Sequence, residues 1–219
     1  KTNSTNWKPA DLVYLMIALV REIYQKQSPQ GELVEAIKKN ETELLSRLID
    51  SFQQMTLFLD ARSNDAALSS LDFIDTEQAI LYGHWLHPTP KSRQGIAFWQ
   101  QSHYSPELAG KFKLHYFSVD KALVMQGSTF SKATSDVLIE EVAKYDSIDL
   151  LPGHVLIPVH PLQVQQLLLE GWVRELLAHG SMIYLGEKGA EYTATSSVRT
   201  VFNEDSEWMY KLSIPVKIT

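Results

Sequence analysis

Apolar residues recur at helical spacing in two stretches near the start of the chain. Steps of three and four residues predict one helix over residues 9–27 and another over residues 33–59. The apolar face of the first helix is formed by Leu12, Leu15, Met16, Leu19 and Ile23, and that of the second by Leu44, Leu45, Leu48, Phe52, Met55 and Leu59. Both stripes are typical of helix faces that pack against a core, so we expect the fold to begin with helices.

The pattern changes near residue 80, after a short helix that we expect Asp75 or Thr76 to cap. Alternating or continuous apolar runs predict strands over residues 112–119, 155–159, 182–185, 192–196 and 209–214. Helices are expected over residues 135–145 and 164–177, the second with a break at Gly171. This order predicts an α+β fold, with a helical region at residues 1–80 and a mixed, mainly antiparallel sheet within residues 81–219.

Composition narrows the class of protein. The chain has 219 residues, 44% of them hydrophobic and 21% charged, which is typical of a globular protein with one or two cores. A net charge of −6 argues against binding nucleic acid. The absence of cysteine excludes disulfides and thiolate chemistry. No stretch is long enough to cross a membrane and residues 1–10 lack a signal-peptide core, so we expect a cytoplasmic protein.

The first cluster of residues that could bind a ligand or take part in a reaction lies in residues 83–95. We expect this segment to form a loop because two prolines interrupt any helix. His87, Lys91 and Arg93 fall within it, and ammonium and guanidinium groups suit phosphate oxygens. A solvated basic loop explains the same residues equally well. A third interpretation is a metal site formed by His84, His87 and His160, but the neighbouring Lys91 and Arg93 would disfavour a bound cation.

Two further motifs have a structural and a functional interpretation. Ser105, followed by proline, is predicted to cap a helix. His160 follows an apolar strand and precedes a helix, which is a frequent place for α/β ligand sites, although a hydrogen-bonded structural histidine is equally consistent with the pattern.

The last motif is rich in hydroxyl groups and spans residues 193–200. If it is extended, Ser197 and Arg199 share one face and can contact a phosphate together. Lys211 lies in the following predicted strand and could face the same cleft if the two strands form an antiparallel hairpin. The alternative is an exposed polar strand. Residue types alone therefore indicate scattered cations that could converge on an anionic ligand, without a Walker phosphate loop.

These motifs, in this order, resemble the siderophore synthetases that work independently of non-ribosomal peptide synthetases, the IucA/IucC or aerobactin synthetase-like family. That family shows G-H-x-x-H-P-x-x-K-x-R-x-G, Y-S-P-E, P-V-H-P-W-Q, A-T-S-S-x-R-T and then K-L-S-I and K-I-T. The matching stretches here are residues 83–95, 104–107, 158–163, 193–200 and 211–219. Leu162 replaces the usual tryptophan, and no charged group is lost.

The resemblance implies a reaction. ATP and a carboxylic acid such as citrate would form an acyl-adenylate, which a polyamine, another amine or a hydroxyl group would then attack. ATP with Mg²⁺ is the expected cofactor. The residues carried over as ATP contacts are Lys91, Arg93, His160, Ser197, Arg199, Thr200 and Lys211. Arg199, Lys211 and His87 are expected to be catalytic.

The family fold is compared to a hand, and the resemblance implies a thumb-like region at residues 1–80 and a fingers-like ATP-binding region at residues 81–219. The first residue is Lys and the last residues read as a strand, so we expect the natural chain to continue into a palm region and this part alone to be catalytically incomplete. Family members often form dimers, which makes a homodimer a further expectation. A non-catalytic nucleotide- or anion-binding module of the same fold is the alternative function.

Overall fold

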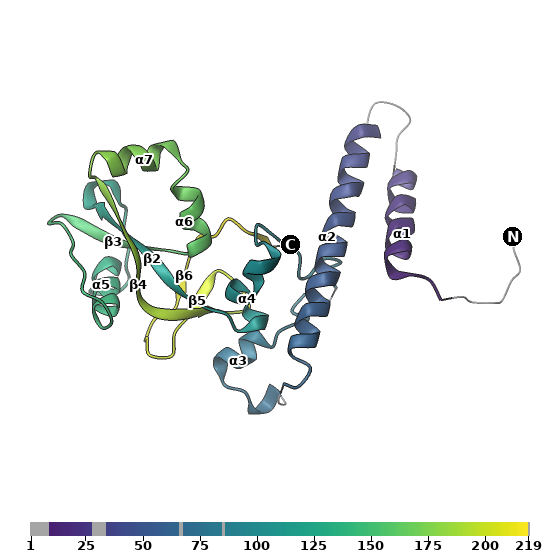
Figure 1. Cartoon of the computed structure of the whole chain (residues 1–219), viewed down its shortest axis with the longest axis horizontal. Helices are drawn as coiled ribbons and strands as arrows, with labels where there is room; N and C mark the ends of the chain where they lie inside the picture. Colours follow the sequence, from purple (N-terminus) through teal and green to yellow (C-terminus); the bar gives the residue numbers. More distant parts are fainter. Residues whose placement is uncertain (1–8, 28–33, 66–67, 85, 219) are drawn as a thin grey trace, which may run out of the picture. The chain divides into compact units, whose positions relative to one another are not determined.

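The computed structural model describes residues 9–27, 34–65, 68–84 and 86–218, and the chain is drawn in Figure 1. It divides into two compact units. The first takes in the described residues up to Asp60 together with Tyr82–Gln94, and the second comprises Ala61–Leu81 and Gly95–Lys217. Residues 28–33, which separate the two predicted N-terminal helices, and Trp85 lie outside the described residues.

The first unit contains two long helices, α1 (Leu12–Gln27) and α2 (Val34–Ala61). Asp11 begins α1 by accepting a 3.0 Å hydrogen bond from the backbone N–H of Tyr14. An ion pair at 3.1 Å joins Arg21 of α1 to Glu41 of α2. No described helix is both long and apolar enough to cross a membrane.

The predicted core face is wrong for most of α1 and holds in part for α2, where Leu44, Leu45, Leu48 and Met55 are half-buried. Leu12, Leu15, Leu19 and Ile23 are exposed, and Val20 is the buried apolar residue of α1. Along α2 the buried face contains Ser51, Gln54 and Phe58, whereas Phe52 and Leu59 are exposed. The reason is that residues 89–94 of the same unit return to α2: the backbone N–H groups of Lys91 and Arg93 donate to Ser51 and Asp50 at 3.1 Å each. Because buried backbone N–H groups need hydrogen-bond acceptors, this segment packs on the face of α2 that offers polar side chains and not on its apolar stripe.

The second unit is built on a five-stranded antiparallel sheet with the order β3-β2-β4-β5-β6. Its strands are β2 (Lys111–Asp120), β3 (His154–Val159), β4 (Met182–Ala194), β5 (Thr200–Phe202) and β6 (Tyr210–Lys211). Outside this sheet, the chain forms two short strands, β1 (Arg93–Gln94) and β7 (Lys217–Ile218). The prediction of an α+β fold with a mainly antiparallel sheet is confirmed.

Helices cover both faces of this sheet (Figure 1). On one face, α5 (Thr134–Ala143) contributes Leu138 and Val142 to a core with alternate residues of β2, which are Phe112, Leu114 and Tyr116. On the other face, α6 (Pro161–Leu167) and α7 (Gly171–Ala178) pack on Phe117 and Val119. The predicted break at Gly171 separates these two helices, and α7 starts there.

Short helices connect the remaining elements. They are η1 (Leu68–Ser70), α3 (Phe73–Gln78), η2 (Phe98–Gln100), α4 (Gln101–Tyr104), η3 (Pro106–Leu108) and η4 (Lys121–Leu123). The cap of α3 is Asp72, whose carboxylate accepts from the backbone N–H of Asp75 at 2.9 Å, so the predicted cap at Asp75 or Thr76 is wrong. An earlier side chain with the same acceptor chemistry takes the position.

Two predictions about local structure change with the tertiary context. The strands predicted over 182–185 and 192–196 are one strand, β4, because Gly186 and Gly189 adopt φ 75° and absorb two register shifts that bend the strand without ending it. Ser105 does lie at the N-cap of η3, but its hydroxyl bonds Gln101 and makes no cap hydrogen bond.

Candidate functional site

The hydroxyl-rich motif forms a tight turn between β4 and β5. The backbone N–H of Thr195 donates to the carbonyl of Thr200 at 2.8 Å, and that of Val198 donates to Thr195 at 2.8 Å. Val198 has a left-handed backbone, with φ 64°. The extended conformation considered from sequence is therefore wrong, because the chain reverses within these residues to pair β5 antiparallel to β4. The residues 195–199 are called the hairpin turn below.

Three predicted ATP contacts lie in or next to the hairpin turn. Ser197 is exposed, and its Oγ accepts the backbone N–H of Thr200 at 3.0 Å. The same oxygen lies 3.2 Å from the Thr195 hydroxyl, and either of these two hydroxyl groups can donate in that bond. Arg199 is half-buried, and its Nη2 donates to the carbonyl of Val216 at 3.1 Å. That bond uses one of the five guanidinium donors and orients the group, so the others can address an anion.

Lys211 lies on the neighbouring strand β6, and the predicted antiparallel hairpin is formed. The register pairs Lys211 with Thr200, one residue beyond Arg199, and the N–H of Leu212 donates to the carbonyl of Arg199 at 2.8 Å. Lys211 is exposed and lines a cavity of about 430 Å³ whose wall also includes Ser135 of α5 and Leu156 of β3. Strands β3 and β6, the two edges of the sheet, thus contribute to one cavity.

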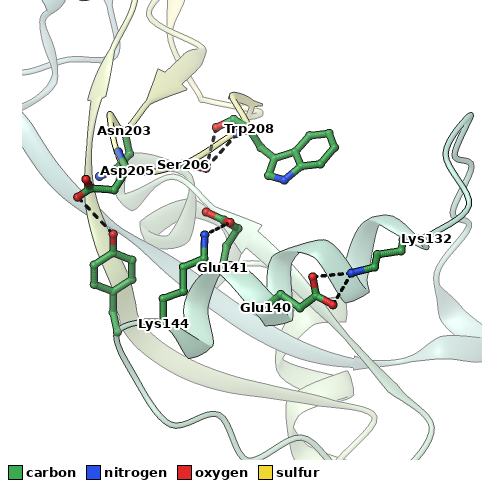
Figure 2. Close-up of polar contacts among 9 residues, drawn as sticks. Lys132, Glu140, Glu141, Lys144, Asn203, Asp205, Ser206 and Trp208 are labelled. Carbon is green, nitrogen blue, oxygen red and sulfur yellow. Dashed lines mark hydrogen bonds and ion pairs between the residues drawn. The ribbon is translucent and has the colours of Figure 1, made fainter.

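Polar contacts fix the connection that leads from β5 into β6, as Figure 2 shows. Asn203 accepts the N–H of Asp205 at 2.8 Å, and the Ser206 hydroxyl bonds the backbone of Trp208 in both directions at 3.1 Å. The Tyr145 hydroxyl, just after α5, reaches the Asp205 carboxylate at 3.5 Å. This connection sets where β6 begins and therefore where Lys211 lies.

His160 is fully buried at the end of β3 and is the N-cap of α6. Its Nδ1 accepts the backbone N–H of Leu162 at 3.1 Å, so the neutral ring carries its proton on Nε2. Rings of Tyr104 and Phe112 lie 5.1 and 4.6 Å from it. Nε2 is buried and has no hydrogen-bond partner among the described residues. Burial, and secondarily the nearby His115, lowers the pKa of His160 to about 3.

This lowered pKa predicts that acid destabilises the fold through His160. Between pH 6.5 and about pH 3 the unfolded chain binds a proton at this ring that the folded chain does not, so stability falls as the pH falls through that window. From pH 7 to pH 5 the expected loss is about 2 kcal/mol. Urea unfolding at several pH values measures it.

The matched variant is His160→Asn, which keeps a side-chain acceptor suited to an N-cap and removes the titrating group. Its stability should depend less on pH by the same amount over this range, whatever its stability at pH 7. Parallel pH profiles for the two proteins would contradict a neutral buried ring at position 160.

The other three predicted site residues, His87, Lys91 and Arg93, lie in the first unit. His87 is exposed, and its Nδ1 accepts the backbone N–H of Thr89 at 3.1 Å, so Nε2 is the free donor of the neutral ring. Lys91 and Arg93 are buried. The guanidinium of Arg93 lies 5.3 Å from the centre of the Phe58 ring, a cation–π contact that gives it a packing role within this unit.

Sequence reasoning missed two residues at the end of α3: Glu77, which contacts the hairpin turn, and Gln78, which contacts the end of β4 that leads into it. The Glu77 carboxylate accepts from Ser196, and the buried Gln78 amide donates to Thr193 and Ala194. More than a hundred residues separate the partners, so no local pattern marks them. Among the described residues, no three His, Asp or Glu side chains gather as metal ligands.

The chain is similar in sequence to a known protein family. A sequence model described as the IucA / IucC family matches residues 72–219. The chain is 40% identical to spermidine-citrate ligase of Bacillus anthracis, over 82% of this chain and 32% of that protein. It is 36% identical to the rhizobactin siderophore biosynthesis protein RhbC of Rhizobium meliloti, over 84% of this chain and 33% of that protein.

Among solved structures, ATP-bound aerobactin synthetase IucA from a hypervirulent pathotype of Klebsiella pneumoniae superposes with a TM-score of 0.84 and 29% identity. That match covers 99% of this chain and 38% of the other. The chain therefore spans about a third of the length of the relatives that it matches.

Proposed function

Because the chain belongs to the IucA / IucC family, we propose that it is the ATP-binding portion of a siderophore synthetase that activates a carboxylic acid such as citrate. The activated acid is an acyl-adenylate, and an amine or hydroxyl group of a second substrate then takes the acyl group. The names of the relatives support this class of reaction, since they include citrate ligases and siderophore biosynthesis proteins.

The observation that carries the proposal is the hairpin turn. It presents the exposed Ser197 hydroxyl and the oriented Arg199 guanidinium two residues apart, with Lys211 on the paired strand. A hydroxyl donor, a planar cation and an ammonium group together suit the oxygens of a triphosphate. The likeness to an ATP-bound synthetase supports the same ligand.

In the first step a carboxylate oxygen of the acid attacks the α-phosphorus of ATP, and the bond to the bridging oxygen breaks to release pyrophosphate. Negative charge grows on the α-phosphoryl oxygens and on the leaving group. Arg199 and Lys211 would stabilise that charge from fixed positions, which costs no reorganisation during the reaction. Ser197 and Thr200 would orient the phosphates by hydrogen bonds.

The remaining predicted contacts have separate roles in the proposal. For His87, Lys91 and Arg93, which lie in the first unit, contact with the triphosphate stays a prediction from the family resemblance. His160 is fully buried as the N-cap of α6, and its contact with ATP stays a prediction from the family resemblance. Mg²⁺ would accompany the triphosphate as its counterion; the described residues offer no three-ligand set of their own for it.

In the second step the nucleophile attacks the acyl carbon and AMP leaves. The name of the Bacillus anthracis relative favours a polyamine as this co-substrate, with citrate as the acid. Self-association into a homodimer stays a prediction from the family resemblance, and light scattering on the purified protein measures it.

Hydroxylamine trapping tests the proposed reaction in the full-length protein. With ATP, Mg²⁺ and citrate, hydroxylamine should intercept the acyl-adenylate, and hydroxamate and pyrophosphate should appear in equal amounts. A panel of other di- and tricarboxylic acids identifies the preferred acid. A protein that binds ATP and yields no hydroxamate with any acid would instead be a non-catalytic nucleotide-binding module.

A further inference from the structure

The hairpin turn carries a backbone conformation that its own sequence disfavours. Val198 lies in the left-handed region at φ 64°, where a β-branched side chain is rare and costly. Its side chain is nonetheless 1% exposed, so the surrounding contacts fix it in place. A conformation of this kind persists only where neighbouring structure over-determines it, and such strain concentrates at ligand sites.

Helix α3 supplies one of those contacts through Glu77. A single carboxylate oxygen, Oε2, accepts from both the Oγ of Ser196 at 2.6 Å and its backbone N–H at 3.2 Å. Hydrogen bonds to a charged acceptor are about twice as strong as neutral ones. The two bonds hold Ser196, the second residue of the turn, two positions before the strained Val198.

The next residue of α3, Gln78, fixes the strand that leads into the turn. It is 3% exposed, and its Nε2 donates to the Thr193 hydroxyl at 2.7 Å and to the Ala194 carbonyl at 3.3 Å. The Thr193 hydroxyl in turn donates a hydrogen bond to the carbonyl of Gly110 at 2.7 Å. Both of these last residues of β4 are thus tied to α3 before the chain reverses.

The two adjacent serines, Ser196 and Ser197, have different hydrogen-bond partners. Ser196 is half-buried and hydrogen-bonded to Glu77, whereas Ser197 is exposed and its hydroxyl contacts only Thr195 and the backbone N–H of Thr200 among the described residues. We propose that Glu77 and Gln78 are positioning residues, which hold the hairpin turn in the shape that directs Ser197 and Arg199 at the triphosphate. This inference rests on the proposed ATP site.

The charge of Glu77 helps to distinguish a positioning role from an electrostatic role. A carboxylate near a triphosphate repels it, so Glu77 weakens ATP binding by its charge and strengthens it by aligning the turn. Replacing Glu77 should therefore raise the KM for ATP only if alignment of the turn is the larger effect. A purely electrostatic or purely stabilising role of Glu77 would not raise this KM.

The test compares Glu77→Ala, Ser196→Ala and the double variant in the full-length protein by hydroxamate formation. Glu77→Ala should raise the KM for ATP about tenfold, and Ser196→Ala, which keeps the backbone bond, about threefold. Because both act through one contact, the double variant should be no worse than Glu77→Ala. Glu77→Gln, which retains an acceptor oxygen, should restore most of the affinity, and the KM for the acid should stay unchanged throughout.

Asp75→Asn, an exposed acidic residue of the same helix, is the matched control and should leave the KM for ATP unchanged. An unchanged KM for ATP in Glu77→Ala, or additive effects in the double variant, would overturn the inference. A raised requirement for Mg²⁺ at constant KM for ATP would overturn it too and assign the carboxylate to the metal. If Glu77→Ala does not fold, Ser196→Ala reports on the same contact from its other end.

Arg199→Ala separates this failure from failure of the proposed function. If Arg199→Ala loses activity while the Glu77 and Ser196 variants keep the KM of the wild type, only the positioning inference fails. If Arg199→Ala also matches the wild type, the hairpin turn is not the ATP site and both proposals fail.

Discussion

Replacing Arg199 with alanine is expected to lower kcat/KM for ATP-dependent hydroxamate formation about 10²–10³-fold. The guanidinium is oriented by the carbonyl of Val216 and belongs to the residue directly after the strained Val198. In the proposed reaction, a fixed cation at this place would stabilise the charge that develops as pyrophosphate leaves, so most of the loss should appear in kcat. Steady-state kinetics over a range of ATP concentrations separates kcat from KM.

Two companion variants sharpen this result. Arg199→Lys keeps the charge and loses the planar fork, so its activity should fall between those of the wild type and Arg199→Ala. Arg174→Ala removes an exposed arginine of α7 and should retain wild-type kinetics. A loss confined to KM, with kcat intact, would show that Arg199 binds ATP without stabilising the transition state.

The largest expected effect on stability comes from Gly95→Ala. Gly95 adopts φ 106°, and a Cβ atom there would lie 2.4 Å from the backbone oxygen of Pro215. Both the strained backbone and the collision with an atom that cannot rotate away oppose the change, so the free energy of unfolding should fall by about 2–4 kcal/mol. Urea unfolding followed by circular dichroism measures this difference.

Two other glycines separate the causes. Gly153 also has a positive φ, of 82°, but a Cβ would meet no atom within 4 Å, so Gly153→Ala should cost about 1 kcal/mol from the backbone alone. Gly127 has open space without a positive φ and should tolerate alanine. Equal stabilities for Gly95→Ala and Gly153→Ala would show that the chain near Pro215 yields to the extra atom.

Short-range patterns in the sequence were sufficient to place most elements of the second unit. The alternation that predicts a strand over 112–119 matches β2, and the break at Gly171 separates α6 from α7. The helical stripes of the first unit indicated the helices and misled about their buried faces. There, hydrogen bonds from the backbone of Lys91 and Arg93 decide which side of α2 is covered.

The candidate site shows the same division. Its residue types and their order are a property of the sequence, and they carried the family resemblance that the comparison with the IucA / IucC family confirms. The shape of the site cannot be read from the sequence in this way. The left-handed conformation of Val198 and the pairing of Lys211 with Thr200 depend on the register of β4, β5 and β6.

By itself, then, the sequence determined the α+β class, the elements of the sheet and the chemistry available for an anion. Only the tertiary structure decided that residues 195–199 form a strained turn, that His160 is a buried neutral cap, and that Glu77 and Gln78 anchor the turn. The physical reason is range. Hydrophobic periodicity and capping act between residues a few positions apart, whereas these contacts join segments that meet only after the sheet has formed.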